Sequence, residues 1–415
     1  MTRRARCLVL FFSLAATVPA FASRWIVKNG DGEKISSLSM FGITEVKVLN
    51  IDGEVYRVLE APDSLMSVKA RDNYTALKSL TNADGIAADL PLELVEPARS
   101  NNKPRRAWHV QRMDYASLPA DRDGRGVVVA VLDTGVDYTH PALKDQMWVN
   151  EGEIPGNKID DDQNGFIDDV HGWDFAKDDA DPKDESSHGT HCAGLVAALP
   201  DVNSGGEGAA PGAKIMAVRM IAGNNSTFLS DAAEAVMYAV DNGAQVLTNS
   251  WRIYASWDDF DPSEENLQLL RSAIGYAESR GVPFVAAAGN ESRDVDNIAE
   301  GIFPVHFKGL SNMVIVASSD MSDRPSSFTN YGLDTVHVAA PGSDIMSTVP
   351  KGRWASKSGT SMATPIVAGL LARAFSGGLP MDQVLDRMNR TAVLNKDFTG
   401  KVRSGIINPQ ELLAY

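Results

Sequence analysis

The run Gly126-Val-Val-Val-Ala-Val-Leu132 leads directly into Asp133-Thr134-Gly135. An unbroken apolar run of this length indicates a strand that is buried on both faces of a parallel sheet. Similar runs recur along the chain, at residues 214–220, 244–250, 282–288 and 313–318. Helical stretches lie between them, at 230–242 and 265–280, and each is followed by a glycine, as is common beyond a helix C-terminus. Strands that alternate with helices predict an α/β fold, in which a parallel central sheet is flanked by helices.

The composition is that of an ordinary globular protein. The chain has 415 residues, of which 44% are hydrophobic and 22% charged, and this excludes a collagen-like or largely disordered protein. Its net charge is 39 − 54 = −15, the wrong sign for a protein that coats nucleic acid or an anionic membrane. The two cysteines are Cys7 and Cys192, and Cys7 lies in a segment that we expect to be removed, so a disulfide scaffold and a cysteine-based zinc site are excluded.

Residues 1–22 are typical of a secretory signal peptide. Arg3, Arg4 and Arg6 precede the apolar stretch 7–18, and Ala20-Phe-Ala22 closes the segment. A basic start, a short apolar core and a small-residue end are the features of a cleaved signal. No later segment reaches about 18 unbroken apolar residues, so we expect no membrane anchor. The prediction is a secreted protein, extracellular or periplasmic, whose net charge without the three arginines is −15 − 3 = −18.

Residues 23–107 read as a separate small unit. Two short alternating runs, 45–50 and 54–59, are joined by Ile51-Asp-Gly53, which predicts a β-hairpin. The polar and basic segment 100–106 then predicts an exposed linker.

Three later segments carry candidate catalytic side chains. Asp133 ends the first buried strand, where open α/β sheets place their sites. His188 opens an apolar helix, and Ser361 lies at the start of a helix that runs to Phe375, because Pro365 is tolerated only near a helix N-terminus. Each residue alone is an ordinary helix-capping residue. Together they occur in the chain order Asp, His, Ser, which is one of the known orders of a serine-protease triad.

These segments resemble the subtilisin family of serine proteases (subtilases) across residues 108–415. Supporting blocks are Gly208-Ala-Ala-Pro211, Ala286-Ala-Ala-Gly-Asn290, Ser327-Phe-Thr-Asn-Tyr-Gly332, Val338-Ala-Ala-Pro-Gly342 and Gly359-Thr-Ser-Met-Ala-Thr-Pro365. The resemblance implies a subtilisin-like catalytic domain at 108–415 and a serine endopeptidase acting on polypeptide substrates. We expect it to be a monomer.

The chemistry of the triad assigns a role to each residue. Ser361 would attack the peptide carbonyl, His188 would take and return its proton, and Asp133 would orient the imidazole. The resemblance assigns the oxyanion donor to Asn290, helped by the backbone N–H of Ser361. His191 lies three residues after His188, but no HExxH context or third ligand accompanies it, so no catalytic metal is expected.

The substrate groove departs from the family pattern. Asn249-Ser-Trp-Arg252 stands where subtilases usually have Asn-x-Ser-x-Gly. By this match Ser250 lines the pocket and Trp251 offers an apolar wall on the other side, while Gly289 belongs to the same binding site. Arg252 replaces the glycine and predicts a preference for acidic residues near it, beside an aromatic or aliphatic preference a few residues before the scissile bond. The alternative is that Arg252 points into solvent and selects nothing.

An acidic stretch predicts a structural calcium site. Residues 160–185 hold eleven acidic residues against two lysines, a net charge of −9. Asp160, Asp162 and Asn164 take positions 1, 3 and 5 of a calcium loop, with Gly165 at position 6. Position 12 is a histidine, so Asp168 or Asp169 is expected to contribute instead. The alternative is a solvated acidic loop. Subtilases often bind calcium, although at a different family site Ala142 stands where an aspartate is usual.

The resemblance also assigns the leading segment and the thiol. Residues 23–107 take the place of an inhibitory, fold-assisting α+β propeptide, and cleavage is expected between Lys103 and Ala107. A permanent accessory domain is the alternative. Cys192 has the place of a structural cysteine of some subtilases, and we expect a buried packing thiol.

Two other functions are consistent with the same motifs. A catalytically retired subtilase acting as a protein-binding module is disfavoured by the intact triad and Asn290. A narrow-specificity processing protease of kexin type is disfavoured because the chain ends at Tyr415, which leaves no room for a following β domain.

Overall fold

The computed structural model describes residues 24–61, 77–95, 107–222, 227–255, 264–298 and 301–415. The predicted signal segment 1–22 and the linker 100–106 lie outside these residues. The chain divides into two compact units. One comprises Met1–Leu90 with Ser263–Leu269, and the other comprises Pro91–Pro262 with Leu270–Tyr415. The division thus falls before residue 107, where the sequence predicts the end of the propeptide.

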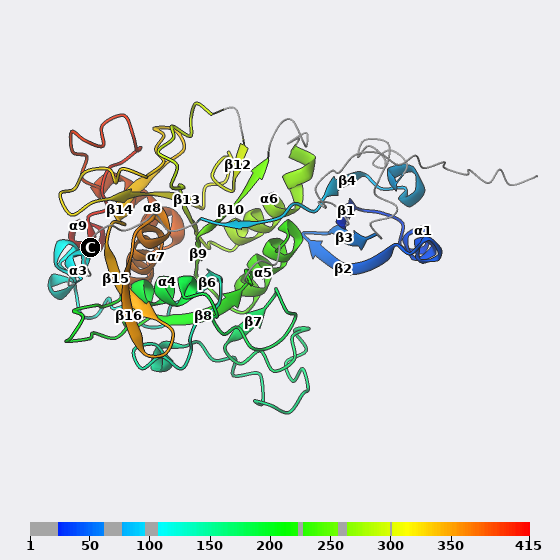
Figure 1. Cartoon of the computed structure of the whole chain (residues 1–415), viewed down its shortest axis with the longest axis horizontal. Helices are drawn as coiled ribbons and strands as arrows, with labels where there is room; N and C mark the ends of the chain where they lie inside the picture. Colours follow the sequence, from blue (N-terminus) through cyan, green and yellow to red (C-terminus); the bar gives the residue numbers. More distant parts are fainter. Residues whose placement is uncertain (1–23, 62–76, 96–106, 223–226, 256–263, 299–300) are drawn as a thin grey trace, which may run out of the picture. The chain divides into compact units, whose positions relative to one another are not determined.

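The first unit is built on an antiparallel four-stranded sheet in the order β2-β3-β1-β4, drawn in blue in Figure 1. Its strands are β1 (Arg24–Lys28), β2 (Thr44–Ile51), β3 (Glu54–Glu60) and β4 (Gly85–Ala88), with α1 (Gly32–Ser37) and the 3-10 turn η1 (Leu38–Phe41) after β1. Asp52 and Gly53 both have positive φ angles, as a two-residue hairpin turn requires. The predicted hairpin is therefore confirmed. Trp25, Val27 and Ile86 form the centre of its core.

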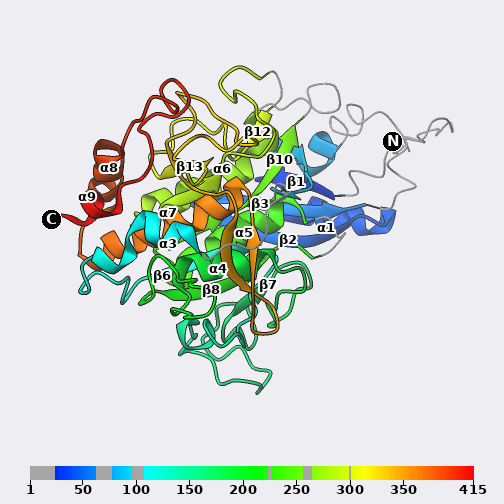
Figure 2. The same ribbon diagram turned by 60° about the vertical axis from the view of Figure 1, so that its left-hand side comes forward.

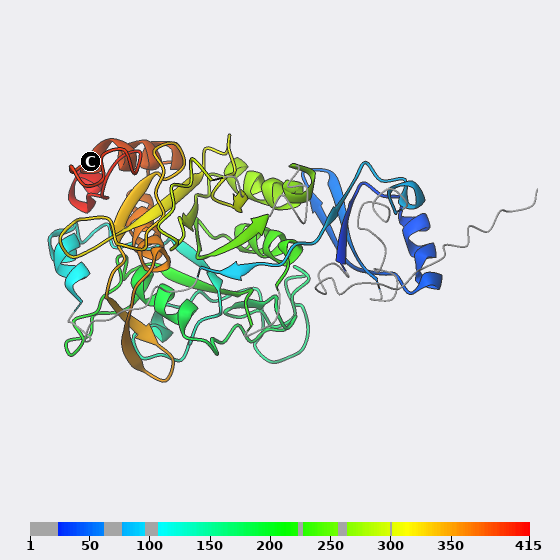
Figure 3. The same ribbon diagram turned by 45° about the horizontal axis from the view of Figure 1, so that its top comes forward.

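The second unit contains a parallel seven-stranded sheet in the order β14-β13-β11-β9-β6-β8-β7 (Figures 1 and 3). The strands are β6 (Val128–Asp133), β7 (Gly172–Asp174), β8 (Lys214–Arg219), β9 (Val246–Asn249), β11 (Phe284–Ala287), β13 (Met313–Ser319) and β14 (Val338–Pro341). Almost every residue of β6, β8, β9, β11 and β13 is buried, because helices cover both faces. The predicted α/β fold is confirmed.

Two long helices pack on one face of this sheet. They are α4 (His188–Ala197) and α7 (Thr360–Ser376), which contact each other and pack on the face that presents Val129 and Val131 of β6 (Figures 1 and 2). Helix α5 (Leu229–Asp241) packs against β6 and β8 outside that core cluster, and Tyr276 of α6 (Glu264–Ser279) donates a hydrogen bond to Asp241 at the end of α5. The remaining helical elements are α3 (Trp108–Met113), η3 (Tyr115–Ser117), η4 (Lys144–Gln146), α8 (Met381–Thr391) and α9 (Pro409–Leu413).

Two small sheets complete the second unit. A three-stranded sheet has the order β12-β10-β5, formed by β5 (Glu93–Leu94), β10 (Trp251–Ala255) and β12 (Gly301–Phe303). A hairpin is formed by β15 (Ile345–Val349) and β16 (Arg353–Lys357). None of the helices among the described residues is long and apolar enough to cross a membrane.

Candidate active site

Asp133 and His188 form a buried hydrogen-bonded pair. Asp133 is the last residue of β6 and His188 the first of α4, and each is 1% exposed. The Nδ1 atom of His188 lies 2.7 Å from Oδ1 and 3.0 Å from Oδ2 of Asp133. Gly189 permits this approach, because a Cβ there would overlap the carbonyl oxygen of Gly135 and lie 3.1 Å from Cβ of Asp133. A carboxylate bonded to Nδ1 holds the tautomer in which Nε2 is free to act as a base.

Ser361 lies in the first turn of α7, as Pro365 predicts. Its side chain is fully buried, and Oγ donates a 2.8 Å hydrogen bond to the carbonyl oxygen of Val95. Within the described part of the chain, Nε2 of His188 has no hydrogen-bond partner. Cys192, one turn after His188, connects the two helices, since its sulfur lies 3.8 Å from Nδ1 of His188 and 3.4 Å from the carbonyl oxygen of Ser361.

Asn290 lies beside the N-terminus of α7. Its Oδ1 accepts hydrogen bonds from the backbone N–H and the hydroxyl of Thr360, at 2.9 and 3.0 Å. These bonds fix the amide plane and turn Nδ2 away from Thr360. Gly289 has a φ of +105°, and a Cβ there would overlap Nδ2 of Asn330, so a glycine is required before Asn290. The structure therefore brings Asp133, His188, Ser361 and Asn290 to the same end of the sheet.

Cys192 and His191 are buried without a role in the triad. Burial, together with the nearby Asp133 carboxylate, raises the pKa of the Cys192 thiol well above its usual range, so the thiol is protonated at neutral pH. Burial lowers the pKa of His191 well below its usual range, and its Nε2 contacts the carbonyl oxygens of Ile345 and Ala355. His191 therefore fastens the β15–β16 hairpin to α4.

Asp184 joins the segments that carry the triad, and sequence reasoning missed it. Its carboxylate accepts hydrogen bonds from the Thr134 hydroxyl at 3.0 Å and from the N–H of Ser187 at 2.8 Å. It also accepts from the N–H and hydroxyl of Thr190, at 2.9 and 2.6 Å. The Thr134 hydroxyl in turn accepts from the N–H of Gly189. Only the folded chain places Thr134 next to α4, so this role of Asp184 has no sequence signal beyond a polar residue before a helix.

Residues 91–95 run between residues 250–252 on one edge and Thr227 on the other, a place that we name the groove, and Val95 reaches Ser361. The N–H of Val95 donates to the carbonyl oxygen of Ser250 at 2.9 Å, and β5 pairs antiparallel with β10, with Glu93 opposite Arg252. On the other side, the N–H of Leu92 donates to the carbonyl oxygen of Thr227 at 2.7 Å. An extended peptide that is hydrogen-bonded on both edges is the binding mode of β-strand addition.

Of the predicted substrate-binding residues, Ser250, Trp251 and Arg252 lie on or next to β10, and Gly289 follows β11. Trp251 is fully buried and packs edge-on against Phe284, with ring centroids 6.1 Å apart. The guanidinium of Arg252 donates to Oε1 of Glu291, the residue after Asn290, and the side chain of Arg252 is only 12% exposed. Burial opposes ionisation of Glu291, but the hydrogen bond and charge of Arg252 outweigh it and lower the pKa of this carboxyl. The alternative, that Arg252 points into solvent, is therefore wrong, and the substrate-binding role of Arg252 stays a prediction.

The acidic loop brings together some of the predicted calcium ligands. Carboxylate oxygens of Asp160, Asp162 and Glu153 lie within 4.8 Å of one another. The N–H of Asn164 donates to both Asp160 and Asp162, at 3.0 and 3.1 Å, and its side-chain amide donates to Asp162. Glu153 precedes the acidic stretch, and sequence reasoning missed it because no ligand spacing includes it.

Asp168 and Asp169 are engaged elsewhere. Asp168 has a positive φ, and its carboxylate accepts from the backbone N–H groups of residues 156–158, at 2.7 to 3.1 Å. Asp169 is fully buried and accepts from the Tyr238 hydroxyl at 2.6 Å and the Asn150 amide at 2.7 Å. Burial raises the pKa of Asp169. Both carboxylates hold the loop together, and neither joins the group formed by Glu153, Asp160 and Asp162.

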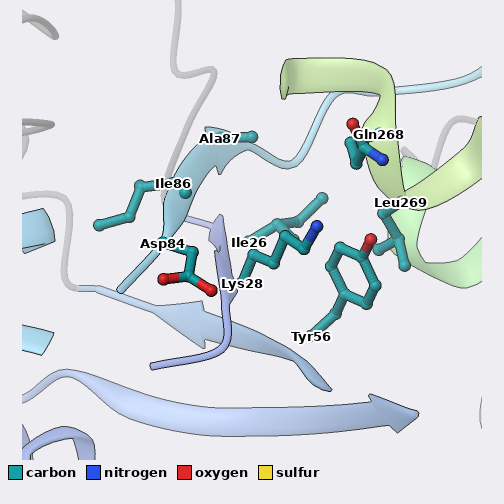
Figure 4. Close-up of a pocket in the computed structure, with 9 residues that line it drawn as sticks. Ile26, Lys28, Tyr56, Asp84, Ile86, Ala87, Gln268 and Leu269 are labelled. Carbon is teal, nitrogen blue, oxygen red and sulfur yellow. The ribbon is translucent and has the colours of Figure 1, made fainter. Parts of the chain in front are cut away.

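A cavity of about 170 Å³ lies in the first unit (Figure 4). Residues of β1, β3 and β4 line it together with Asp84 and with Gln268 and Leu269 of α6. Lys28 points into it near the ring of Tyr56. It contains none of the predicted site residues.

Comparison with known proteins gives consistent matches. The profile of the Subtilase family matches residues 124–405. The thermophilic serine proteinase of Bacillus sp. (strain AK1) is 33% identical over 365 residues, which cover 87% of this chain and 78% of that protein. Thermitase of Thermoactinomyces vulgaris is 36% identical over 270 residues, covering 65% of this chain and 82% of thermitase. The crystal structure of the epidermin leader peptide processing serine protease of Staphylococcus aureus superimposes with a TM-score of 0.71 and 22% identity, covering 95% of this chain and 98% of that one. This last match concerns the fold.

Proposed function

The chain belongs to the subtilase family and is a serine endopeptidase, and we propose that it cleaves peptide bonds with Asp133, His188 and Ser361. The single observation that carries this assignment is the 2.7 Å contact between Nδ1 of His188 and Asp133, at the same end of the sheet as the Ser361 hydroxyl. The covalent step forms an acyl-enzyme on Ser361, which water then hydrolyses.

Each residue has one task in this mechanism. His188 Nε2 takes the proton from Ser361 Oγ during attack and gives it to the leaving amine. Asp133 keeps Nδ1 protonated and stabilises the imidazolium. The Asn290 amide nitrogen and the Ser361 N–H, which lies at the positive end of α7, would hold the oxyanion. Removing one such donor typically reduces the rate about a hundred- to thousandfold.

We propose further that the protein is secreted and made as a zymogen. Residues 1–22 supply the signal, and residues from 23 onward act as an inhibitory propeptide. This is supported by the strand 91–95, because a segment of the chain itself occupies the groove in which a substrate would bind. The Ser361 hydroxyl then has a neighbour from the propeptide rather than from a foreign peptide.

We also propose a structural calcium ion in the acidic loop. Asp160, Asp162 and Glu153 offer carboxylate oxygens, and hard oxygen donors suit this ion. Three carboxylates this close repel one another, and a divalent cation would offset that repulsion. The ion would stabilise the loop and take no part in the reaction, since none of its candidate ligands contacts the triad.

The test compares the full-length wild-type chain with Ser361→Ala. Wild type should hydrolyse casein and a fluorogenic peptide, and an organophosphonate should label Ser361 alone. Ser361→Ala should show neither reaction. Ser358→Ala is the matched control, because Ser358 is also a buried serine near the start of α7 but bonds to the backbone of Asp344. Casein hydrolysis by pure Ser361→Ala protein would refute the assignment.

A further inference from the structure

The last described residues of the propeptide lie in the groove in one register. Val95 pairs through its N–H with Ser250, and Leu94 and Glu93 lie opposite Trp251 and Arg252. An isolated bridge joins Pro91 to Phe228 on the other edge. Both edges of the strand are hydrogen-bonded, so a shift by one residue would break these bonds and turn every side chain to the opposite face.

This register places one carbonyl group at the nucleophile. Ser361 Oγ donates to the carbonyl oxygen of Val95 at 2.8 Å, so this carbonyl is the one that the serine contacts. The Val95 side chain is 1% exposed and Leu92 is 7% exposed, whereas Glu93 is exposed. The groove therefore encloses the side chains of Val95 and Leu92 and leaves Glu93 to solvent.

The predicted linker end is held at a different place. The N–H of Ala107 donates to the carbonyl oxygen of Ser204, and the indole N–H of Trp108 donates to Ser343. Ala107 and Trp108 thus bind partners that the strand 91–95 does not share. A cut between Lys103 and Ala107 would require the chain to leave the register of residues 91–95 first.

We propose that the bond this protease cleaves first in its own chain is the peptide bond between Val95 and Glu96. The inference rests on the proposed function and names its first substrate. Ser361 Oγ attacks the Val95 carbonyl carbon while its proton passes to His188 Nε2. The bond to the nitrogen of Glu96 breaks, and that nitrogen receives the proton from His188. Water then hydrolyses the Val95 ester, which leaves a carboxylate at Val95 and restores the Ser361 hydroxyl.

The test follows the amino-terminal fragment by intact mass. Full-length wild-type chain, with the signal removed, is incubated and sampled at short times in acid. The first fragment should end at Val95, and its partner should begin at Glu96. Later trimming of the partner leaves the carboxyl end of the fragment unchanged, so this end records the first cut. A first fragment that ends between Lys103 and Arg106 would overturn the proposal.

Three variants address the register. Val95→Asp would bury a carboxylate beside the nucleophile and should slow release of the fragment about tenfold or more. Val95→Ala should still be cut at residue 95, and Lys103→Ala, in the linker, should be cut as wild type is. Melting temperatures of the same variants in a Ser361→Ala background verify that they fold. Val95→Asp that folds and is cut after residue 95 at the wild-type rate would also overturn the proposal.

Failure of this inference is distinct from failure of the proposed function. If the enzyme hydrolyses casein but releases a fragment that ends in the linker, the proposed function stands and the proposed first cleavage site is wrong. If the wild-type chain cuts neither itself nor casein, both before and after trypsin has cleaved the linker, the proposed function is wrong.

Discussion

Asp184→Asn should disable catalysis, although Asp184 lies outside the triad. Its carboxylate is 4% exposed and connects Thr134, the neighbour of Asp133, to Thr190 in the first turn of α4. Ser187, which precedes His188, has a left-handed backbone and no side-chain cap of its own, so Asp184 accepts the N–H groups that a helix start leaves unpaired. One carboxylate therefore fixes the position of the base relative to the residue that orients it.

The magnitude follows from the hydrogen bonds. Oδ1 accepts from the Thr134 hydroxyl and the N–H groups of Ser186 and Ser187, and Oδ2 accepts from the N–H and hydroxyl of Thr190. An amide would turn its NH₂ group toward one of these sets, so at least two donors lose their acceptor. A buried donor without a partner costs about 1–3 kcal/mol, which gives a loss of about 2 kcal/mol or more in the free energy of unfolding. A shift of about 1 Å in the base can reduce the rate about a hundredfold.

The assay separates a positioning role from a loss of fold. We expect kcat per titrated active site to fall between about tenfold and a hundredfold. KM should change little, because the hydrogen bonds of Asp184 go to Thr134, Ser186, Ser187 and Thr190 and not to residues 91–95 or β10. Asp181→Asn is the matched control, since Asp181 lies in the same loop, is exposed, and undergoes the same change of charge. Unfolding is measured in a Ser361→Ala background to prevent autolysis. An unchanged kcat in the folded, titrated Asp184→Asn enzyme would refute the reasoning.

Three further predictions concern calcium, specificity and pH. Calcium should raise the melting temperature of wild type, by an amount equivalent to about 2.7 kcal/mol at a hundredfold excess over Kd. Asp162→Ala should abolish most of that gain and leave the initial rate of hydrolysis unchanged. If neither calcium nor the substitution changes the melting temperature, the loop is only a solvated acidic loop. In a peptide-library digest, Arg252→Gly should reduce the preference for an acidic residue at the position of Glu93 by less than about fivefold, because Glu291 already pairs with Arg252. A larger loss would show that the charge of Arg252 is available to substrate. His109 is fully buried, and burial lowers its pKa to about 3, so below pH 6.5 the unfolded chain binds a proton that the folded chain does not. The free energy of unfolding should then fall by up to about 1.4 kcal/mol per pH unit from about pH 6.5 to 3, and His109→Leu should flatten that slope in pH-dependent urea melts.

The layout of the catalytic unit was predictable because its signals are local. Strands buried on both faces are apolar at every position, so the run 126–132 predicted β6, which the structure has at Val128–Asp133. The glycines after α5 and α6 have positive φ angles, +84° at Gly243 and +70° at Gly281, and they end these helices as predicted. The hairpin β15–β16 was not predicted, since its strands are short and their residues do not alternate in polarity.

The parts of the site that depend on contacts distant in sequence were not predictable. Glu153 joins the acidic group only because the chain between residues 153 and 160 turns back and brings the two carboxylates close together. Asp168 was expected to replace the missing ligand at position 12, but its backbone is left-handed and its carboxylate binds the backbone N–H groups of residues 156–158. Arg252 meets Glu291 because β9 and β11 are paired, which brings together the segments that follow these two strands. Sequence spacing identifies residue types, whereas such pairings depend on the backbone path.

The contact between the β6 end and the α4 start shows why backbone proximity decides the chemistry of this site. A side chain at residue 189 would overlap the carbonyl oxygen of Gly135, so any larger residue would push α4 away from Asp133. The 2.7 Å bond from His188 to Asp133 depends on that approach, and the hydroxyl of Thr134 accepts the N–H of Gly189 in the same place. Gly189 lets α4 approach Asp133 without a clash. Asp184 binds Thr134 in turn, and its hydrogen bonds hold α4 and the end of β6 together. Gly189→Ala should therefore lower kcat even where the hydrogen bonds of Asp184 persist, and a Gly189→Ala enzyme with wild-type kcat would show that α4 can move without loss of the His188–Asp133 bond.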